Sequence, residues 1–467
     1  MAVLSLVGAR MDSPALLLDL LSCPSAKPAF STMSETSLDK IISEERFAEV
    51  LGAEAEMFFR IANSVQQESG RQRRRQYLYQ LGIEADLVES FLDDHGAKHN
   101  ESFCFFRELV ASVRGFAQVG FALEHLDRRF DSYGTLLHQV LEDREAFLSS
   151  ITQASAFVVE SIFSLLDAIR SEADLFGVQI PAKLFPEERY TTGLVNLQLP
   201  HNLGDEEIED DGHKIAEVAS KYLQVCAMFR EAGVRAIHDP VRREEFFARA
   251  CNEQRARVYE ATVHNLQSAY DTHLLGSTLE RSDDRLPSLR GHASAAFHLL
   301  EAVTGLVHFV ERHEAGARVD DQKRRIGECI SRERAREVTL NNLLYWSSEL
   351  ILLGGPLARE ILSSFSNLQE LVLEVPEGIT IHARPASLIV AIVNHHDMPV
   401  EMEVDGKVCN AASILEVLIN AGSNAEESRY TFRGDAGALA DLDALFQCGL
   451  GERGLDEFPD RLGYLRS

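Results

Sequence analysis

The stretch "VPEGITIHARPAS", residues 375–387, places one histidine between an extended run and the apparent start of a helix. Pro385 is tolerated only in a first helical turn, because deeper in a helix it would remove a backbone hydrogen bond. His382 is therefore expected at or just before a helix N-terminus, where free N–H groups and the helix dipole stabilise an anion. Arg384 adds a fork of donors suited to phosphate oxygens. The pattern predicts an imidazole that accepts a phosphoryl group; a solvent-facing or capping histidine is the alternative.

The residues around this stretch predict a small α+β domain over 368–448. Alternating apolar and polar residues in "LQELVLEV" and "PVEMEVDGKVC" are typical of half-buried strands, and Asp405-Gly406 between two such pieces is a strong hairpin signal. Two short amphipathic helices and a further strand follow, at 413–420, 436–446 and 428–434. The order is strand, helix, hairpin, helix, strand, helix, which places the helices on one face of an antiparallel sheet.

The motif "IHARPA" in front of an amphipathic helix resembles the active-site signature of HPr, the histidine phosphocarrier of the bacterial phosphoenolpyruvate-dependent phosphotransferase system. The likeness continues through "GKVCNAASILEVL" and "RYTFRGDAGALADLDALF", so it spans about 370–447. The resemblance implies an open-faced sandwich in which His382 is the phosphorylated histidine and Arg384 steadies its phosphate. It also implies an Enzyme I-type protein as the phosphoryl donor.

The second predicted helix of this domain carries two further features that the resemblance assigns. Ser413 matches the serine that HPr kinase phosphorylates as a regulatory mark in some bacteria. Serine is also a good N-cap, which explains it without a kinase. Ile414, Leu415 and Leu418 match the apolar patch on which partner proteins dock.

The same domain departs from the family in two respects. Thr380 stands where the family has a glycine two residues before its histidine, and Gly378 is displaced from that place. The docking face lacks the usual ring of lysines, and residues 368–448 carry thirteen acidic and four basic side chains. Electrostatic steering toward acidic partners is therefore expected to be weakened or reversed.

The rest of the chain is predicted to be mainly helical and multidomain. One helical bundle is expected over 39–177, with a long helix from Tyr133 to Ile169, and a second bundle over 213–366. Between them, 178–212 is expected to be an irregular acidic linker, and Gly354-Gly355-Pro356 predicts a break between two buried helices. Residues 449–467 are expected to form a C-terminal tail, and 1–38 a disordered tail or a mis-called start, with Met33 as the other possible start.

Composition narrows the classes of function. A net charge of -27 argues against nucleic acid and anionic membrane surfaces as partners. Seven scattered cysteines without a CxxC pair predict a reduced, cytoplasmic protein. The sequence has no run of about 18 uninterrupted apolar residues, so we predict no transmembrane helix.

Two groups of residues are candidates for a metal site. His292, His298, His308 and His313 lie on one expected helix, but none of their spacings stacks a pair over a single turn. Asp93, Asp94, His95 and His99 surround Gly96, which undermines a continuous helix. We therefore predict no metal site and no cofactor.

The sequence supports three hypotheses of function. The first is a regulatory protein whose HPr-like domain accepts a phosphoryl group on His382 and signals through the helical region or a partner. The second is a docking module that is not phosphorylated, within a helical scaffold protein. The third and weakest is a metal-dependent helical enzyme fused to an HPr-like switch. A phosphoryl carrier or regulator is expected rather than a true enzyme.

Overall fold

The computed structural model describes most of the chain beyond Lys40. The described residues are 41–67, 74–136, 141–186, 212–314, 320–365, 368–376, 378–396, 398–424, 427–452, 454, 456 and 458–466. The tail predicted at 1–38 lies outside them, as does most of the linker predicted at 178–212.

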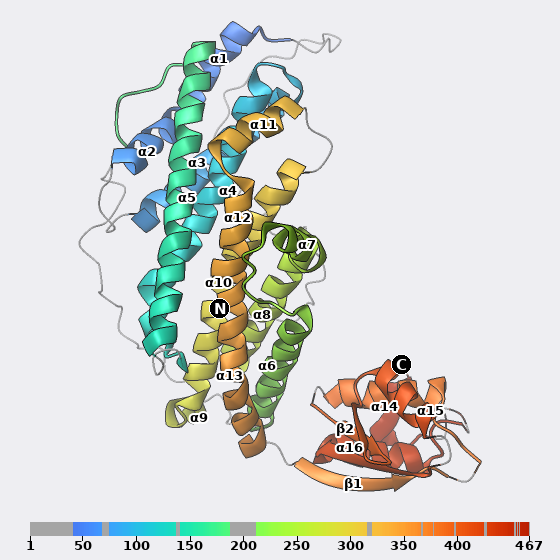
Figure 1. The fold of residues 1–467 in the computed structure, drawn as a ribbon. Helices are drawn as coiled ribbons and strands as arrows, with labels where there is room; N and C mark the ends of the chain where they lie inside the picture. The colour runs from blue at the N-terminus through green and yellow to red at the C-terminus, as the bar shows by residue number, and fades with distance from the viewer. Residues whose placement is uncertain are drawn as a thin grey trace, which may run out of the picture. The chain divides into compact units, whose positions relative to one another are not determined.

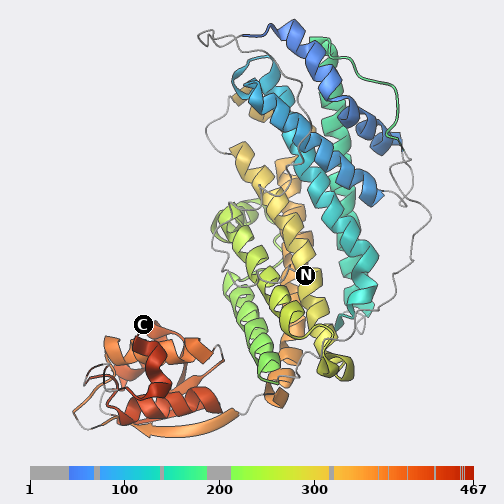
Figure 2. The same ribbon diagram turned by 180° about the vertical axis from the view of Figure 1, so that it is seen from behind.

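The described residues before 366 are mainly helical (Figures 1 and 2). Its first part contains α1 (Glu44–Glu54), α2 (Glu56–Gln67), α3 (Arg74–Asp94), α4 (Phe103–Arg129) and α5 (Leu141–Phe176). Its second part contains α6 (Gly212–Ala232), α7 (Pro240–Ala250), α8 (Glu253–His273), α9 (Thr278–Ser282), α10 (Arg285–Glu314), α11 (Asp320–Cys329), α12 (Arg332–Glu337) and α13 (Tyr345–Phe365). A π-helical segment, Val338–Leu344, joins α12 to α13.

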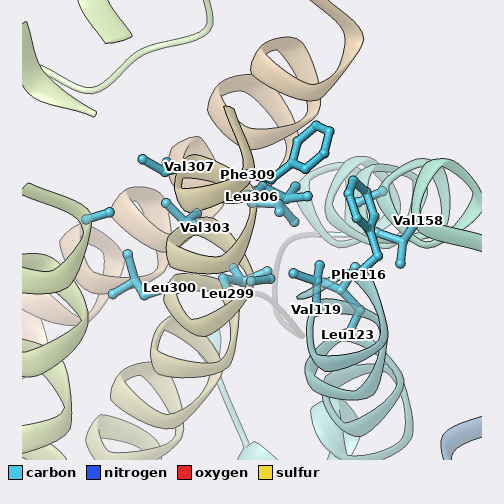
Figure 3. Packing of buried hydrophobic residues seen from close by; sticks show 14 of the residues in the cluster. Phe116, Val119, Leu123, Val158, Leu299, Leu300, Val303, Leu306, Val307 and Phe309 are labelled. Carbon is cyan, nitrogen blue, oxygen red and sulfur yellow. The ribbon is translucent and has the colours of Figure 1, made fainter. Parts of the chain in front are cut away.

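Helices α4 and α10 pack against each other, so side chains from both parts form one hydrophobic cluster. Figure 3 shows the contact, in which Phe116 and Val119 of α4 face Leu299 and Leu306 of α10. The rings of Phe116 and Phe309 meet edge to face with centroids 5.0 Å apart. Burial of this apolar surface contributes about 25 cal/mol of stabilising free energy per Å² removed from water. It is the main force that holds the helices together.

The long helix predicted from Tyr133 to Ile169 begins later than expected. Phe130–Tyr133 form a 3₁₀ turn, Gly134 takes a left-handed φ of 62°, and α5 starts at Leu141. Apolar residues continue at helical spacing through this turn, so the sequence pattern alone does not indicate it.

The break predicted at Gly354-Gly355-Pro356 is wrong, because α13 runs through all three residues. Pro356 removes one backbone donor inside the helix. The two glycines allow α13 to approach α6 closely. A Cβ at Gly354 would lie 2.2 Å from the Tyr222 hydroxyl, and one at Gly355 would lie 3.4 Å from the Cys226 sulfur. The glycines therefore serve helix packing and do not end the helix.

Two helices among the described residues are long and apolar enough to cross a membrane by length and composition. They are Asp143–Phe176 and Arg285–Arg312, and 39% and 72% of their most apolar stretches are buried inside the protein. Both belong to the hydrophobic cluster described above, and a core helix passes the same test.

The C-terminal region is an α+β domain in the predicted order of elements. It consists of β1 (Leu368–Glu374), α14 (Ala383–His396), β2 (Glu401–Val404), β3 (Lys407–Asn410), α15 (Ile414–Ser423), β4 (Arg429–Asp435) and α16 (Ala436–Gln447). The strands form one antiparallel sheet in the order β1-β4-β2-β3. Met402, Tyr430 and Phe432 on the inner face of the sheet are buried in one cluster with residues of the three helices. The predicted fold class is confirmed.

The hairpin between β2 and β3 forms at the predicted residues. Asp405 and Gly406 take φ angles of 48° and 73°, the left-handed pair that a tight two-residue turn requires. Val404 and Lys407 face each other on either side of the turn.

The segment after α16, expected to be a tail, contributes to the core of this domain. Leu450, Phe458 and Leu462 are buried with the residues of α14 and α16. Asp441 on α16 anchors the end of the segment by accepting hydrogen bonds from Arg461 Nε at 2.6 Å and from the Tyr464 hydroxyl at 2.8 Å.

Candidate functional site

His382 directly precedes α14, as the sequence predicts. The Ala386 N–H donates to the His382 carbonyl at 3.0 Å, which is the first hydrogen bond of the helix. Pro385 lies in the first turn, where its missing N–H costs no helical bond. The His382 side chain is 53% exposed, so an incoming group can reach the ring.

The two ring nitrogens of His382 have different partners. The backbone N–H of Arg384 donates to Nδ1 at 3.4 Å, which directs the Nδ1 lone pair toward the N-terminus of α14. Nε2 lies 3.2 Å from Oε1 of Glu452, in the segment after α16. The side of the ring that faces the free N–H groups of the helix is therefore the side that carries a lone pair.

Arg384 is exposed beside this ring. Among the residues that the structure describes, no carboxylate forms an ion pair with it. A phosphoryl group on Nδ1 would therefore meet both the positive end of the α14 dipole and a guanidinium available for bidentate contact.

The loop before His382 avoids strain without a glycine at position 380. Thr380 accepts a hydrogen bond from the His382 N–H at 3.0 Å. Gly378 takes a left-handed φ of 82° and closes a turn in which the Ile379 N–H donates to Pro376. The displaced Gly378 thus supplies the left-handed conformation in this loop.

The N-terminus of α15 carries the other residues that the sequence singled out. The Ser413 hydroxyl caps this helix by accepting from the Glu416 N–H at 3.4 Å. Ile414 and Leu415 are 44% and 65% exposed, whereas Leu418 packs partly against the core. Ile419, one turn after Leu415, is 59% exposed and extends the apolar surface, which its i, i+4 spacing could have revealed.

Glu452 is the site residue that sequence reasoning missed. It lies 70 residues after His382 in the sequence, in the segment that follows α16. No local pattern in "CGLGERG" indicates that this carboxylate reaches the start of α14.

The histidines weighed as metal ligands have other partners. His292 is buried, and its Nε2 accepts from the Leu136 N–H at 3.0 Å. His298 bonds to Glu301, and His308 lies 3.1 Å from Glu253. The side chain of His313 lies outside the described residues.

The candidate metal ligands near Gly96 also have other partners. Asp93 pairs with Arg107, and His95 bonds to the Phe91 carbonyl beside the left-handed Gly96. In the part of the chain that the structure describes, no three His, Cys, Asp or Glu side chains gather as a metal site.

Comparison with known proteins agrees with the geometry of the C-terminal domain. Residues 369–447 match the sequence model of a family described as "PTS HPr component phosphorylation site". The search of curated proteins and the search of solved structures found no match for the chain. The C-terminal part of this chain is thus an HPr-like domain, a module of the phosphotransferase-system phosphocarrier type.

Proposed function

We propose that His382 accepts a phosphoryl group from an Enzyme I-type donor, and that the helical region or a partner protein reads the phosphorylation state. The observation that carries this proposal is the direction of the His382 Nδ1 lone pair, toward the Arg384 N–H at the start of α14. The exposed Arg384 side chain and the helix dipole supply positive charge where the phosphate oxygens would lie.

The transfer step needs no group other than the donor. Nδ1 attacks phosphorus, and a Nδ1–P bond forms while the bond between phosphorus and the donor's leaving atom breaks. The donor atom keeps that electron pair, and the Nε2 proton stays on the ring. The product is a phosphohistidine from which the phosphoryl group can move to an acceptor.

The surface charge of the domain indicates a partner unlike those of lysine-ringed carriers. Residues 368–448 carry thirteen acidic and four basic side chains, and Glu416 stands on the exposed face of α15. A donor with a neutral or basic rim fits this face better than an acidic one. Association with such a donor would weaken as salt is added.

The test is to mix the full chain with Enzyme I and labelled phosphoenolpyruvate, and to measure acid-labile phosphate. We expect labelling of the wild type that His382→Ala abolishes. His395→Ala is the matched control, because His395 lies at the other end of α14 and stacks on Tyr464. Unlabelled wild type, or labelling that survives His382→Ala, contradicts the proposal.

A docking module that is not phosphorylated is the second candidate, and the exposed apolar surface of Ile414, Leu415 and Ile419 favours it. In that case Leu415→Asp abolishes partner binding while His382→Ala leaves it unchanged. Val408→Asp is the control, since Val408 is also exposed but belongs to β3. Binding that depends on the phosphorylation of His382 would favour the first candidate.

We also propose Ser413 as a regulatory phosphorylation site for a kinase of the HPr kinase type. Ser413 caps α15 beside the exposed apolar residues. A phosphate there would gain from the helix dipole, but it would bring negative charge to the docking surface. Incubation with such a kinase and ATP should label the wild type and not Ser413→Ala.

A further inference from the structure

The structure assigns a role to Glu452, which lies outside the residues that match the phosphocarrier family. We propose that Glu452 is a positioning residue for His382: its carboxylate holds the Nε2 proton and thereby keeps Nδ1 as the nucleophile. This inference rests on the proposed phosphorylation of His382 and deepens it.

The two contacts of the His382 ring require the same tautomer. A backbone N–H can only donate, so Nδ1 must be the unprotonated nitrogen in its 3.4 Å contact with Arg384 N. In a neutral imidazole the proton then lies on Nε2. Glu452 Oε1 lies 3.2 Å from Nε2, within ion-pair distance, on the side of the ring that carries this proton. Without Glu452, only the weak 3.4 Å contact with Arg384 N would favour this tautomer, so the share of the other tautomer would rise.

The backbone that carries Glu452 is held in a left-handed turn. Gly449, Leu450 and Gly451 take φ angles of 76°, 56° and 80°. A leucine is sterically disfavoured in this conformation, but the side chain of Leu450 is fully buried in the domain core. The Glu452 N–H donates to the Gly449 carbonyl at 3.0 Å and closes the turn. Burial of Leu450 therefore maintains a turn that delivers Glu452 to the ring.

Close packing against α14 fixes the same turn from the other side. A Cβ on Gly451 would lie 2.5 Å from Cδ1 of Leu388, so only glycine fits there without movement. Leu388 lies on α14 less than two turns after His382. The turn thus packs on the helix whose N-terminus forms the site, which places the backbone of Glu452 close enough for its side chain to reach the ring.

The carboxylate also suits the charge that develops during transfer. When Nδ1 bonds to phosphorus while Nε2 keeps its proton, positive charge builds up on the ring. A carboxylate at Nε2 stabilises this charge, in the way that an acid residue supports the histidine of a hydrolytic triad. The proton kept on Nε2 also lets the ring leave as a neutral imidazole when the phosphoryl group moves on.

The first experiment measures the ring tautomer in the unphosphorylated protein by ¹⁵N NMR of His382 at mildly alkaline pH. We expect the Nε2–H tautomer to dominate in the wild type and in Glu452→Gln, whose amide oxygen still accepts the hydrogen bond. Glu452→Ala should show a mixture. Asp460→Asn is the matched control, because Asp460 is an exposed acid of the same C-terminal segment. A tautomer distribution that is unchanged in Glu452→Ala overturns the proposal.

The second experiment measures phosphoryl transfer from Enzyme I to the same variants. Glu452→Ala should lower kcat by about tenfold or more with little change in KM for the donor, since Glu452 contacts the ring. ³¹P NMR should show that some of its phosphate has moved to Nε2. Glu452→Gln should keep the regiochemistry but lose rate, because the charge is gone. Transfer by Glu452→Ala at the wild-type rate and only to Nδ1 overturns the proposal. A wild type that takes no phosphate refutes the proposed function instead, and the tautomer measurement still decides the role of Glu452.

Discussion

Gly354 of α13 lies against Tyr222 of α6 so closely that a Cβ at position 354 would come within 2.2 Å of the tyrosine hydroxyl. Tyr222 is buried, and its hydroxyl oxygen has no hydrogen-bond partner among the described residues. The contact is therefore a packing constraint, with no polar interaction to compensate for a shift.

Gly354→Ala should lower the free energy of unfolding of the helical region by about 1–3 kcal/mol through overpacking. The fluorescence of Trp346, the single tryptophan of the chain, during urea unfolding is a suitable measurement because Trp346 lies on α13. Gly355→Ala is the matched control, with 3.4 Å to the Cys226 sulfur, and should be neutral or stabilising since alanine favours helix. Tyr222→Phe removes the hydroxyl but leaves Cζ 2.8 Å from the added Cβ, so a partial rescue of Gly354→Ala confirms the clash.

Asp441 should anchor the C-terminal segment, and with it Glu452. Burial acts to raise the pKa of Asp441, but hydrogen bonds from His396, Tyr464 and Arg461 outweigh it and hold this pKa below the ordinary value of 3.8. A carboxylate with a lowered pKa stabilises the domain above pH 3.8, and that stabilisation is lost as the pH falls through the folded-state pKa.

Asp441→Ala should therefore cost about 1–3 kcal/mol, because the half-buried donors His396 and Tyr464 and the exposed Arg461 lose their acceptor. Amide hydrogen exchange across 449–466 should report the loss. Asp443→Ala is the control, since Asp443 contacts only Gln447 one turn away among the contacts seen for it. Equal protection in both variants would show that the segment is held by its apolar residues alone.

His125 should make the helical region sensitive to acid. Burial and the neighbouring His298, Arg75 and Arg129 lower the pKa of His125 to about 4 from its ordinary 6.5. Its Nε2 lies 3.2 Å from the Tyr133 hydroxyl. Between pH 6.5 and 4 the unfolded chain binds a proton at this residue that the folded chain does not, so stability falls as the pH falls.

The measurement is the urea midpoint of Trp346 fluorescence at pH 7 and at pH 5. His125→Phe keeps an aromatic ring and should show a smaller loss between the two values than the wild type. His264→Phe is the control, because His264 packs on Phe297 of the same region. An unchanged pH dependence in His125→Phe would assign the acid sensitivity to other groups.

Local patterns predicted the C-terminal domain well, because each of its elements has its own signal. The strands alternate, Asp405-Gly406 fits only a tight turn, and Pro385 limits where α14 can begin. The sequence did not predict two features, and for a common reason: each depends on a contact between residues that are far apart in the sequence. Gly354 looks like a helix end until α6 is seen packed on it, and Glu452 looks like a tail residue until the turn at Leu450 brings it to His382.

Ser413 should stabilise α15 as a cap, independently of any kinase. Its hydroxyl accepts from the Glu416 N–H, which is one of the donors that a helix start leaves without an intrahelical partner. Ser413→Ala should cost about 1 kcal/mol in the unfolding of the C-terminal domain, whereas Ser413→Asp should retain the cap and add a favourable charge to the helix dipole. Amide exchange of α15 checks both variants. If Ser413→Asp weakens binding to the donor while α15 stays protected, the charge acts on docking and not on folding, because Ile414 and Leu415 lie exposed beside it.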